Sequence, residues 1–252
     1  MTETHRRVAI VTGASRGIGR ACANALAKAG FDLYLVADGT EEELKAACVE
    51  CSACGATAQY GVFDLSRPES AEAAAKGALD ALGRIDVLVN NAGIRIRHPF
   101  GEFTAAEFDT LIALNLRAAF LLSQAVLPAM RLAGGGRVVH IASQLGLVAD
   151  PGSALYGIAK AGLIHLTRSM AYELAKDGIL VHAVSPGPIE TEFYKERMRR
   201  EPDLRERRLA YLPVGRLGTP EEIAEVVTFL ATTNATFMTG GNVVVDGGYV
   251  TH

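Results

Sequence analysis

The sequence has few of the features expected of a secreted, membrane-bound or nucleic-acid-binding protein. It contains only four cysteines, Cys22, Cys48, Cys51 and Cys54, and the last three are crowded together, unlike a disulfide framework. We find no signal-peptide pattern ahead of the first apolar run, and no run of about 18 apolar residues that predicts a transmembrane helix. The net charge of −3 gives no attraction to nucleic acid or anionic membranes. We therefore expect a cytoplasmic protein without nucleic acid or membrane partners.

Low-complexity tracts, proline- and serine-rich linkers and internal repeats are also missing from the 252 residues. Instead, continuously apolar strand-length runs alternate with helix-length stretches, as in strands buried on both faces. The predicted strands are Val8–Val11, Leu33–Ala37, Ala58–Phe63, Ile85–Val89, Arg137–Ile141, Leu180–Val184 and Val243–Val245. The predicted helices are Gly17–Ala29, Glu41–Cys54, Glu69–Leu82, Ala105–Met130, Ser153–Lys176 and Glu221–Ala231. This alternation predicts one domain, residues 1–252, with a Rossmann-like doubly wound α/β fold and a seven-stranded parallel sheet flanked by helices.

The first predicted strand runs into a glycine-rich turn, and a predicted helix follows. Gly13, Gly17 and Gly19 allow the backbone to turn tightly and to approach a pyrophosphate, while the helix N-terminus offers N–H groups to its negative charge. The alternative is a structural turn without a ligand. The glycine-rich turn is the first strand-to-helix turn of a predicted α/β chain, and this position favours dinucleotide binding.

Tyr156 and Lys160 lie four residues apart in a predicted helix, so their side chains share one face. A nearby ammonium, helped by the positive charge of an oxidised dinucleotide cofactor, favours the phenolate, so we expect a lowered pKa for Tyr156 and a role as general acid/base. Ser143 follows the fifth predicted strand and can donate a hydrogen bond to the same substrate oxygen. The alternative for Tyr156 and Lys160 is a half-buried tyrosine beside a solvated lysine. Asn115 is a poor residue for the middle of an apolar helix, which suggests a purpose for it.

These motifs together resemble the short-chain dehydrogenase/reductase family over nearly the full length of the chain, with a likeness to its 3-oxoacyl-[acyl-carrier-protein] reductases. The matching features are the spacing G-x-x-x-G-x-G, the sequence Asn90-Asn91-Ala92-Gly93, the set Asn115, Ser143, Tyr156 and Lys160, and the turn Pro186-Gly187. The resemblance implies that this set is catalytic, with Asn115 in a proton relay and Lys160 bonded to the nicotinamide ribose. It also implies a lid over the substrate at residues 192–212. It further implies a homotetramer built as a dimer of dimers, in which the two long apolar helices form the interface within each dimer.

The glycine loop and the resemblance together define a candidate cofactor site for NAD or NADP. Its predicted residues are Gly13, Ser15, Arg16, Gly17, Ile18, Gly19, Asp38, Asp64, Leu65, Asn90, Ala92, Gly93, Tyr156, Lys160, Pro186, Gly187, Ile189 and Thr191. The resemblance implies that Asp64 and Leu65 lie beside the adenine, Asn90 and Gly93 along the adenosine half, and Ile189 and Thr191 at the carboxamide. Asp64 has an alternative as a helix cap for the stretch after Pro68.

The choice between NAD and NADP depends on the residues that end the second predicted strand. An acidic side chain there accepts a hydrogen bond from the ribose 2′-hydroxyl and repels a 2′-phosphate. Asp38 occupies this place, and Glu41, Glu42 and Glu43 follow it closely. Arg16 argues for NADP, because basic residues at that position in the family often meet the 2′-phosphate. On charge grounds we favour NAD.

Several further residues are weighed as substrate or metal contacts. We expect Ser143, Gln144, Tyr156 and Arg95 to line the substrate pocket, and Arg97 or His98 could also touch an acidic group. The arginines of residues 195–208 could attract an anionic substrate, but we expect most to be solvated and paired with glutamates. Cys48, Cys51 and Cys54 lack a fourth ligand, so we predict no metal site. We read His140 as a satisfied core residue.

Three functions remain open at this point. The first is NAD(P)-dependent transfer of a hydride between nicotinamide and a small secondary alcohol or ketone, with Tyr156 as general acid/base. The second is an NADPH-dependent 3-oxoacyl-[acyl-carrier-protein] reductase, which needs a basic docking surface for an acidic carrier. The third is a dinucleotide-binding sensor or scaffold that has lost catalysis, and the intact set of four catalytic residues argues against it.

Overall fold

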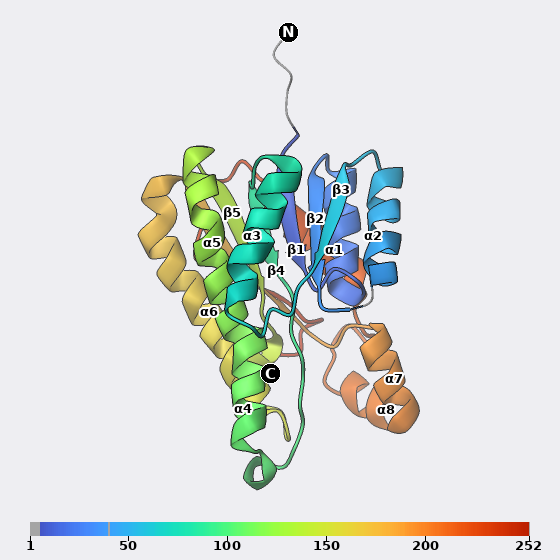
Figure 1. The fold of residues 1–252 in the computed structure, drawn as a ribbon. Helices are drawn as coiled ribbons and strands as arrows, with labels where there is room; N and C mark the ends of the chain where they lie inside the picture. The colour runs from blue at the N-terminus through green and yellow to red at the C-terminus, as the bar shows by residue number, and fades with distance from the viewer. Residues whose placement is uncertain (1–5, 40, 252) are drawn as a thin grey trace.

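Short runs of valine, isoleucine and leucine form the parallel sheet at the centre of the protein (Figure 1). The computed structural model describes residues 6–39 and 41–251, so the first residues, on which the signal-peptide expectation partly rests, lie outside this range. The strands are β1 (Val8–Thr12), β2 (Asp32–Ala37), β3 (Ala58–Val62), β4 (Val87–Asn90), β5 (Gly136–Ile141), β6 (Ile179–Pro186) and β7 (Asn242–Val245). They form a seven-stranded parallel sheet in the order β3-β2-β1-β4-β5-β6-β7, which confirms the predicted fold class.

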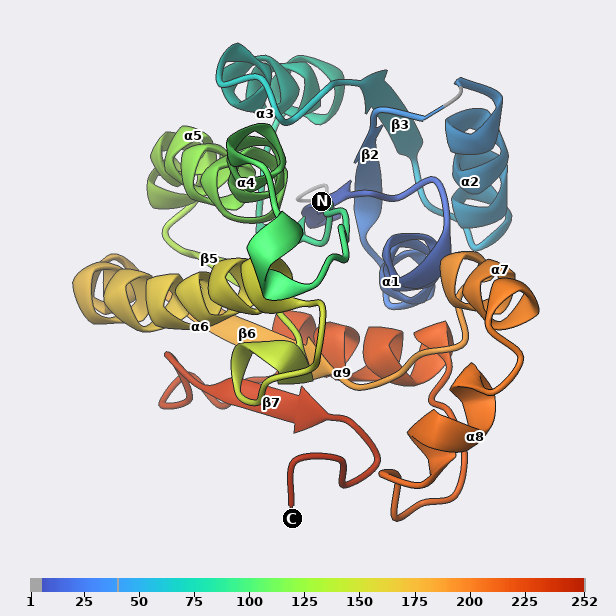
Figure 2. The same cartoon turned by 90° about the horizontal axis from the view of Figure 1, so that it is seen from below.

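Helices cover both faces of the sheet and enclose a core on each side (Figure 2). The α-helices are α1 (Gly17–Lys28), α2 (Glu41–Ala53), α3 (Glu69–Leu82), α4 (Ala105–Ile112), α5 (Ala118–Leu132), α6 (Ala154–Leu174), α7 (Glu192–Arg200), α8 (Leu204–Leu209) and α9 (Pro220–Thr232). The short helices are η1 (Phe100–Glu102), η2 (Ala113–Arg117), η3 (Gln144–Gly146) and η4 (Ala175–Asp177). Buried side chains of α1, α2 and α9 pack on one face, and those of α3, α5 and α6 pack on the other.

The strands differ in burial according to their place in the sheet. All residues of β1, β4 and β6 are buried, as continuous apolar runs predict. The expectation of burial on both faces is wrong for β3 and β7, whose residues are largely intermediate or exposed. These two strands form the edges of the sheet, where one side has no neighbouring strand.

The predicted helix Ala105–Met130 is not one continuous α-helix. Residues Ala113–Arg117 form a π-helical turn, η2, in which the amide of Ala118 donates to the carbonyl oxygen of Ala113. Such turns hold one extra residue and occur frequently at functional sites. Segment 192–212, predicted as a lid, contains the two short helices α7 and α8, which project from the body of the domain (Figure 1).

One helical stretch of the described residues, Ala105–Leu132, is long and apolar enough to cross a membrane by length and composition, which the sequence analysis did not expect. It packs against α3, α6 and the central sheet, with Leu111, Leu122 and Met130 fully buried. Core helices of globular domains have the same composition. Two of its large apolar residues, Phe108 and Phe120, are exposed.

A polar contact lies inside the core beneath the carboxyl edge of the sheet. His140 on β5 is fully buried, and its Nδ1 lies 3.2 Å from Nδ2 of Asn90 on β4. Asn90 also donates to Ser123 Oγ at 3.1 Å. The Nε2 atom of His140 has no hydrogen-bond partner among the described residues, so the expectation of a satisfied core histidine holds for one ring nitrogen only.

Burial predicts that His140 makes the protein sensitive to mild acid. Burial, followed by the charge of Lys160, lowers the pKa of His140 to about 3. Below the ordinary pKa of histidine the unfolded chain binds a proton that the folded protein does not, so stability falls as the pH decreases from about 6.5 towards 3. Between pH 6.5 and pH 4.5 this effect amounts to about 2 kcal/mol.

Urea unfolding of the cofactor-free protein across this pH range measures the loss. A His140→Gln variant is expected to lose about 2 kcal/mol less than the parent over the same interval. His165 is exposed on α6, so a His165→Gln variant is the control and should follow the parent. Parallel curves for the parent and His140→Gln would contradict the assignment.

Candidate functional site

Four loops meet at the carboxyl edge of the sheet, where the strand order reverses between β1 and β4. They follow β1, β4, β5 and β6, and Figure 2 views the domain from this side, on which α7 and α8 also lie. Ligands of doubly wound sheets bind at such a switch point. The Thr12 hydroxyl joins two of the loops, because it accepts hydrogen bonds from the amides of Asn91 and Ala92, both at 2.9 Å.

The glycine loop after β1 has the backbone that a phosphate cradle requires. Gly13 and Gly17 have φ values of +63° and +57°, which side chains rarely allow. A side chain at Gly19 would collide with the carbonyl oxygen of Gly13. Asn91 holds the loop from the other side, with its Nδ2 donating to the carbonyl oxygens of Thr12 at 2.9 Å and Gly13 at 3.2 Å. The sequence analysis assigned no role to Asn91.

The N-terminus of α1 is left open for an anion. Its N-cap, Arg16, has extended backbone and makes no side-chain cap, and no acidic residue lies in the first turn. The amides at this terminus therefore point into the loop without competition from a carboxylate. Ser15 is buried beside the loop, Arg16 is exposed, and Ile18 packs against the core. These residues fit the pyrophosphate of a dinucleotide.

Tyr156, Ser143 and Lys160 converge at the end of β5. Ser143 is buried in the loop after the strand, and its side chain shares a hydrogen bond with that of Tyr156. Lys160 is 4% exposed, and its Nζ donates to the carbonyl oxygen of Ile141 at 2.8 Å. The same Nζ lies 5.6 Å from the centre of the Tyr156 ring. Residues 156 and 160 therefore share one face of α6, as predicted from their spacing.

Asn115 lies in the π-helical turn η2 and points towards the same place. Its Nδ2 donates to the carbonyl oxygens of Ile94 at 2.9 Å and Leu111 at 3.1 Å, while its buried Oδ1 has no partner among the described residues. A side chain at Gly93 would collide with this Oδ1 and would lie 3.7 Å from Lys160 Nζ. Because Gly93 has no side chain, the unpaired Oδ1 of Asn115 and the buried Nζ of Lys160 can both lie close to it.

Burial has the largest effect on the pKa of Tyr156 in the cofactor-free protein. Burial raises this pKa above its ordinary value, and the charge of Arg95 and the hydrogen bond from Ser143 oppose the change only in part. Lys160 is itself strongly desolvated, which lowers its pKa to about 8. In the cofactor-free protein burial of the phenol is therefore the larger effect, and the lowering of the Tyr156 pKa by Lys160 together with an oxidised nicotinamide stays a prediction for the complex.

The residues predicted to lie along the adenosine half of a dinucleotide have different surroundings. Asp64 is exposed, and its Oδ1 accepts hydrogen bonds from the amide of Ser66 at 2.9 Å and its hydroxyl at 2.6 Å. It does not cap α3, whose N-cap is Pro68. Leu65 is buried in the core, and the side chain of Asn90 points inward to His140, which leaves its backbone at the strand end.

The residues predicted beside the carboxamide follow β6. Pro186 ends the strand, and the amide of Gly187 donates to Val245 at 2.9 Å. Ile189 is buried and pairs with Gly218 in an isolated bridge. The Thr191 hydroxyl accepts a hydrogen bond from the amide of Tyr194 at 3.3 Å and so caps α7. A side chain at Gly17 would lie 3.5 Å from Thr191, so this turn adjoins the glycine loop.

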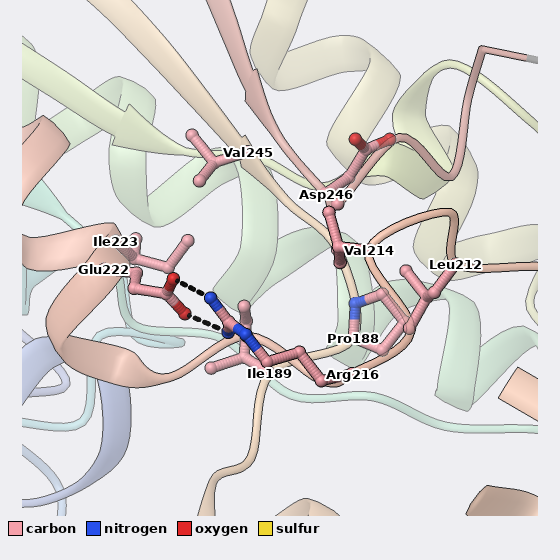
Figure 3. A pocket seen from close by; sticks show the side chains of 12 residues that line it. Pro188, Ile189, Leu212, Val214, Arg216, Glu222, Ile223, Val245 and Asp246 are labelled. Atoms are coloured by element: carbon pink, nitrogen blue, oxygen red, sulfur yellow. Dashed lines mark hydrogen bonds and ion pairs between the residues drawn. The ribbon is translucent and has the colours of Figure 1, made fainter. Parts of the chain in front are cut away.

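A small cavity of about 100 Å³ lies beside this turn but away from Tyr156 (Figure 3). Pro188, Ile189, Val214 and Asp246 line it, whereas the four predicted catalytic residues do not. Gln144, predicted as a pocket residue, is buried near its rim, with Oε1 2.9 Å from the place of a side chain at Gly187. We regard the cavity as a neighbour of the carboxamide turn and not as the reaction centre.

The arginines near Tyr156 are organised by a carboxylate that the sequence analysis missed. Asp150, in the loop after η3, accepts hydrogen bonds from Arg95 at 3.1 Å, Arg97 at 3.2 Å and Arg208 at 2.9 Å. The expectation that most of the arginines in residues 195–208 are solvated and paired holds for Arg199, Arg200 and Arg207, whereas Arg197 and Arg208 are only 11% and 13% exposed. An aspartate before Pro-Gly resembles an ordinary turn, so the sequence gives little sign of Asp150.

Comparison with known proteins identifies the family to which the chain belongs. The chain matches the family described as enoyl-(acyl carrier protein) reductase over residues 13–250. It is 39% identical over 242 residues to a 3-oxoacyl-[acyl-carrier-protein] reductase, FabG, of Vibrio cholerae, a match that covers 96% of each chain.

Two solved structures share both the fold and part of the sequence. One is described as a 2-deoxy-D-gluconate 3-dehydrogenase from Agrobacterium tumefaciens with bound NADP, with 34% identity, a TM-score of 0.89 and coverage of 98% and 97% of the two chains. The other is described as an NAD(P)-dependent gluconate 5-dehydrogenase from Beutenbergia cavernae, with 36% identity, a TM-score of 0.91 and the same coverage. These matches confirm the resemblance: the chain belongs to the short-chain dehydrogenase/reductase family and is an NAD(P)-dependent oxidoreductase acting on CH–OH or C=O groups.

Proposed function

We propose that the protein interconverts a small secondary alcohol and the corresponding ketone, with Tyr156 as the general acid/base. The observation that carries this proposal is the convergence of Tyr156, Ser143, Lys160 and Asn115 beside an open glycine loop. In reduction the Tyr156 hydroxyl gives its proton to the substrate oxygen, and in oxidation the phenolate takes it back. A sensor or scaffold has no need for this arrangement.

The neighbours of Tyr156 prepare it for proton transfer. The Ser143 hydroxyl donates to the substrate oxygen and fixes it in line with the phenol. Lys160 keeps a positive charge below the ring, which favours the phenolate when the phenol loses its proton. The unpaired Oδ1 of Asn115 is placed to accept a hydrogen bond from a water molecule that returns protons from solvent.

The open N-terminus of α1 and the glycine loop hold a dinucleotide by its pyrophosphate in this proposal. Lys160 also binds the nicotinamide ribose, and Ala92, Gly93, Ile189 and Thr191 line the path between the two ends. When bound, the nicotinamide supplies or accepts the hydride that the reaction requires.

We propose NAD as the preferred cofactor, on electrostatic grounds. Asp38 is exposed at the end of β2, and Glu43 Oε2 lies 3.0 Å from the place of a side chain at Gly39. Both carboxylates repel a 2′-phosphate. NADP is the second candidate, because Arg16 is exposed on the other side of the loop and the relative from Agrobacterium tumefaciens is described with bound NADP.

Reduction of a 3-oxoacyl thioester is a second candidate for the reaction. The FabG relative from Vibrio cholerae favours it, since that match covers nearly the whole of both chains. The two candidates use the same four catalytic residues and differ in the substrate that reaches them. Comparing turnover of an acetoacetyl thioester with that of small ketones separates them.

We also propose that segment 192–212 is a lid over the substrate, since α7 and α8 stand at the carboxyl edge (Figure 1). The four described cysteines are free thiols, which supports a reducing, cytoplasmic location. The outward faces of α5 and α6 expose Phe120 and Ile158, which are 43% and 52% accessible. We therefore propose that these helices form a dimer interface within a homotetramer.

Removing the Tyr156 hydroxyl should abolish most of the activity. A Tyr156→Phe variant is expected to lose about a hundredfold or more in kcat, because proton transfer by a positioned side chain contributes that much. Its affinity for the reduced dinucleotide, measured by fluorescence titration, should stay within about threefold. Tyr172 is 92% exposed on the same helix, so Tyr172→Phe is the matched control. Full turnover by Tyr156→Phe would rule out the proposed role.

Removing the charge of Asp38 should weaken the preference for NAD. An Asp38→Ser variant is expected to shift the ratio of kcat/KM for NADH over NADPH towards NADPH by about fivefold, since two like unit charges about 4 Å apart repel by about 1 kcal/mol even in water. Glu72 is exposed on α3 and serves as the control position for a Glu72→Gln variant. A parent enzyme that prefers NADPH would contradict the choice of NAD.

The proposed dimer interface predicts a defined change of mass in solution. Light scattering should give the mass of four chains for the parent and a smaller mass for a Phe120→Glu variant, because the added carboxylate would be buried without a partner. Val49 is exposed on α2, away from these helices, so Val49→Glu should keep the parent mass. A monomeric parent would contradict the proposal.

A further inference from the structure

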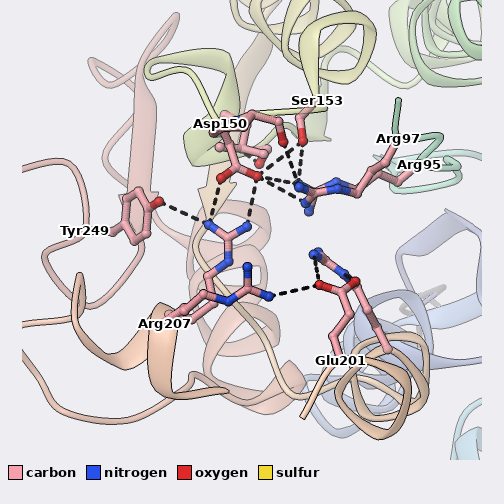
Figure 4. A network of polar contacts seen from close by, with 12 residues as sticks. Arg95, Arg97, Asp150, Ser153, Glu201, Arg207 and Tyr249 are labelled. Carbon is pink, nitrogen blue, oxygen red and sulfur yellow. Dashed lines mark hydrogen bonds and ion pairs between the residues drawn. The ribbon is translucent and has the colours of Figure 1, made fainter. Parts of the chain in front are cut away.

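Four largely buried arginines from distant parts of the sequence are joined to two carboxylates in one polar network (Figure 4). We call them the arginine cluster: Arg95 and Arg97 from the loop after β4, Arg197 from α7 and Arg208 from α8. Their side chains are 19%, 29%, 11% and 13% exposed, respectively. Arginine is seldom buried to this extent without a partner for its charge.

Two carboxylates hold the arginine cluster in place. Asp150 receives Arg208 through both guanidinium nitrogens, with Nη1 to Oδ1 and Nη2 to Oδ2 both at 2.9 Å. Arg197 pairs with Glu201 at 2.8 and 3.1 Å, and Glu201 also receives the exposed Arg207. The side chain of Asp150 is 8% exposed, so this carboxylate is committed to the cluster and not to solvent.

The arginine cluster holds more positive than negative charge. Its four guanidinium groups share two carboxylates, one of which also pairs with the exposed Arg207, so positive charge is in excess. Burial, followed by the charge of Arg97, lowers the pKa of Arg95 to about 10, although Tyr156 and Asp150 oppose this shift. Two buried donors, Arg95 Nε and Arg197 Nη1, have no acceptor among the described residues. An uncompensated buried charge is costly, so the cluster is incomplete without an anion.

One member of the cluster, Arg95, lies next to the proposed reacting group. The guanidinium carbon of Arg95 is 5.3 Å from the centre of the Tyr156 ring. Arg95 Nη2 also donates at 2.8 Å to the hydroxyl of Ser153, the residue that precedes the helix carrying Tyr156. An anion bound here would therefore belong to a molecule whose alcohol or ketone carbon lies only a short chain away.

We propose that the arginine cluster binds a carboxylate of the substrate, so that the substrates are short hydroxy acids and their oxo acids. The inference rests on the proposed function, because the carboxylate is placed relative to the carbon that Tyr156 serves. A carboxylate suits the site because Arg208 already holds one through a two-pronged contact. Arg197 and Arg208 belong to segment 192–212, so the anion would also draw this segment onto the body of the domain.

A purely structural role is the alternative for these arginines, since they also tie α7 and α8 to the loops after β4 and β5. Loss of a structural tie would lower turnover of charged and neutral substrates alike. Loss of an anion contact would raise KM for the charged substrate alone. The two roles are therefore separated by comparing substrates that differ only in charge.

The experiment uses secondary hydroxy acids with one to four carbons between the alcohol carbon and the carboxylate, each paired with its neutral amide and with the matching phosphate ester. Absorbance of the reduced nicotinamide gives kcat and KM for the full-length parent, Arg97→Gln and Arg95→Gln. Arg199→Gln is the control, because Arg199 is on the same helix as Arg197, is 68% exposed and pairs with Glu196.

The parent should prefer at least one acid over its amide by tenfold or more in kcat/KM, as one charge-assisted contact provides. Arg97→Gln should bring this ratio close to one by raising KM for the acid, with kcat for the amide retained, and Arg199→Gln should keep the parent ratio. Equal use of acids and amides by the parent, an unchanged ratio in Arg97→Gln, or a preference for the phosphate ester would overturn the proposal.

A binding measurement separates failure of this inference from failure of the proposed function. Thermal unfolding is followed with mono- and dicarboxylates of two to six carbons, in the presence of the dinucleotide. A rise in melting temperature in the parent that Arg97→Gln loses supports the carboxylate site even if none of the alcohols is oxidised. If none of the carboxylates raises the melting temperature of the parent, the inference falls, whereas turnover of the neutral amides would leave the proposed function standing.

Discussion

The buried ammonium of Lys160 next to the phenol of Tyr156 is the constraint on which the rest of the site depends. The ammonium of Lys160 is nearly inaccessible, and its described hydrogen bond is to the carbonyl oxygen that ends β5. Three independent parts of the fold accommodate it: α6 carries it on the face of Tyr156, Gly93 leaves room above it, and η2 brings Asn115 to its side. Because burial lowers the pKa of Lys160 to about 8, the ammonium stays charged at neutral pH and loses its charge as the pH rises through that value.

Opposing effects act on the pKa of Tyr156 in the cofactor-free site. Burial makes the Tyr156 phenol a weaker acid than free tyrosine, while Arg95 and Ser143 pull its pKa down. A phenol with opposing influences of this kind responds strongly to any further positive charge in the cleft. In the cofactor-free protein the Tyr156 hydroxyl therefore keeps its proton. The reactive phenolate belongs to the complex with cofactor and substrate.

Much of the architecture follows from the sequence, because short apolar runs separated by amphipathic stretches allow few folds other than a doubly wound sheet. The spacing of Tyr156 and Lys160 placed both on one helical face, and the fourteen residues of α3 have the predicted bounds. The exposure of β3 was not predicted, since an edge strand is defined by its missing neighbour and not by its own residues.

The arginines were harder to interpret for the same reason. Alternating arginine and glutamate in residues 195–208 is typical of a solvated helix, and Arg199 behaves in this way. Arg208 is instead buried and paired with Asp150. The two residues are 58 positions apart in the sequence and meet only in the folded protein. Likewise, the π-helical turn has no sequence signature of its own, and the polar Asn115 was its only trace.

That turn also couples the two halves of the long apolar helix. One residue corresponds to about 100° of rotation in an α-helix, so the extra residue in Ala113–Arg117 sets the angular offset between α4 and α5. Deleting one residue there would rejoin the two helices smoothly but would rotate the faces of α4 away from α6, carrying Leu111 out of its contacts with Leu155. The π-helical turn therefore fixes the rotation of α4 relative to α5. Insertions or deletions in this stretch would change that rotation, whereas substitutions would not.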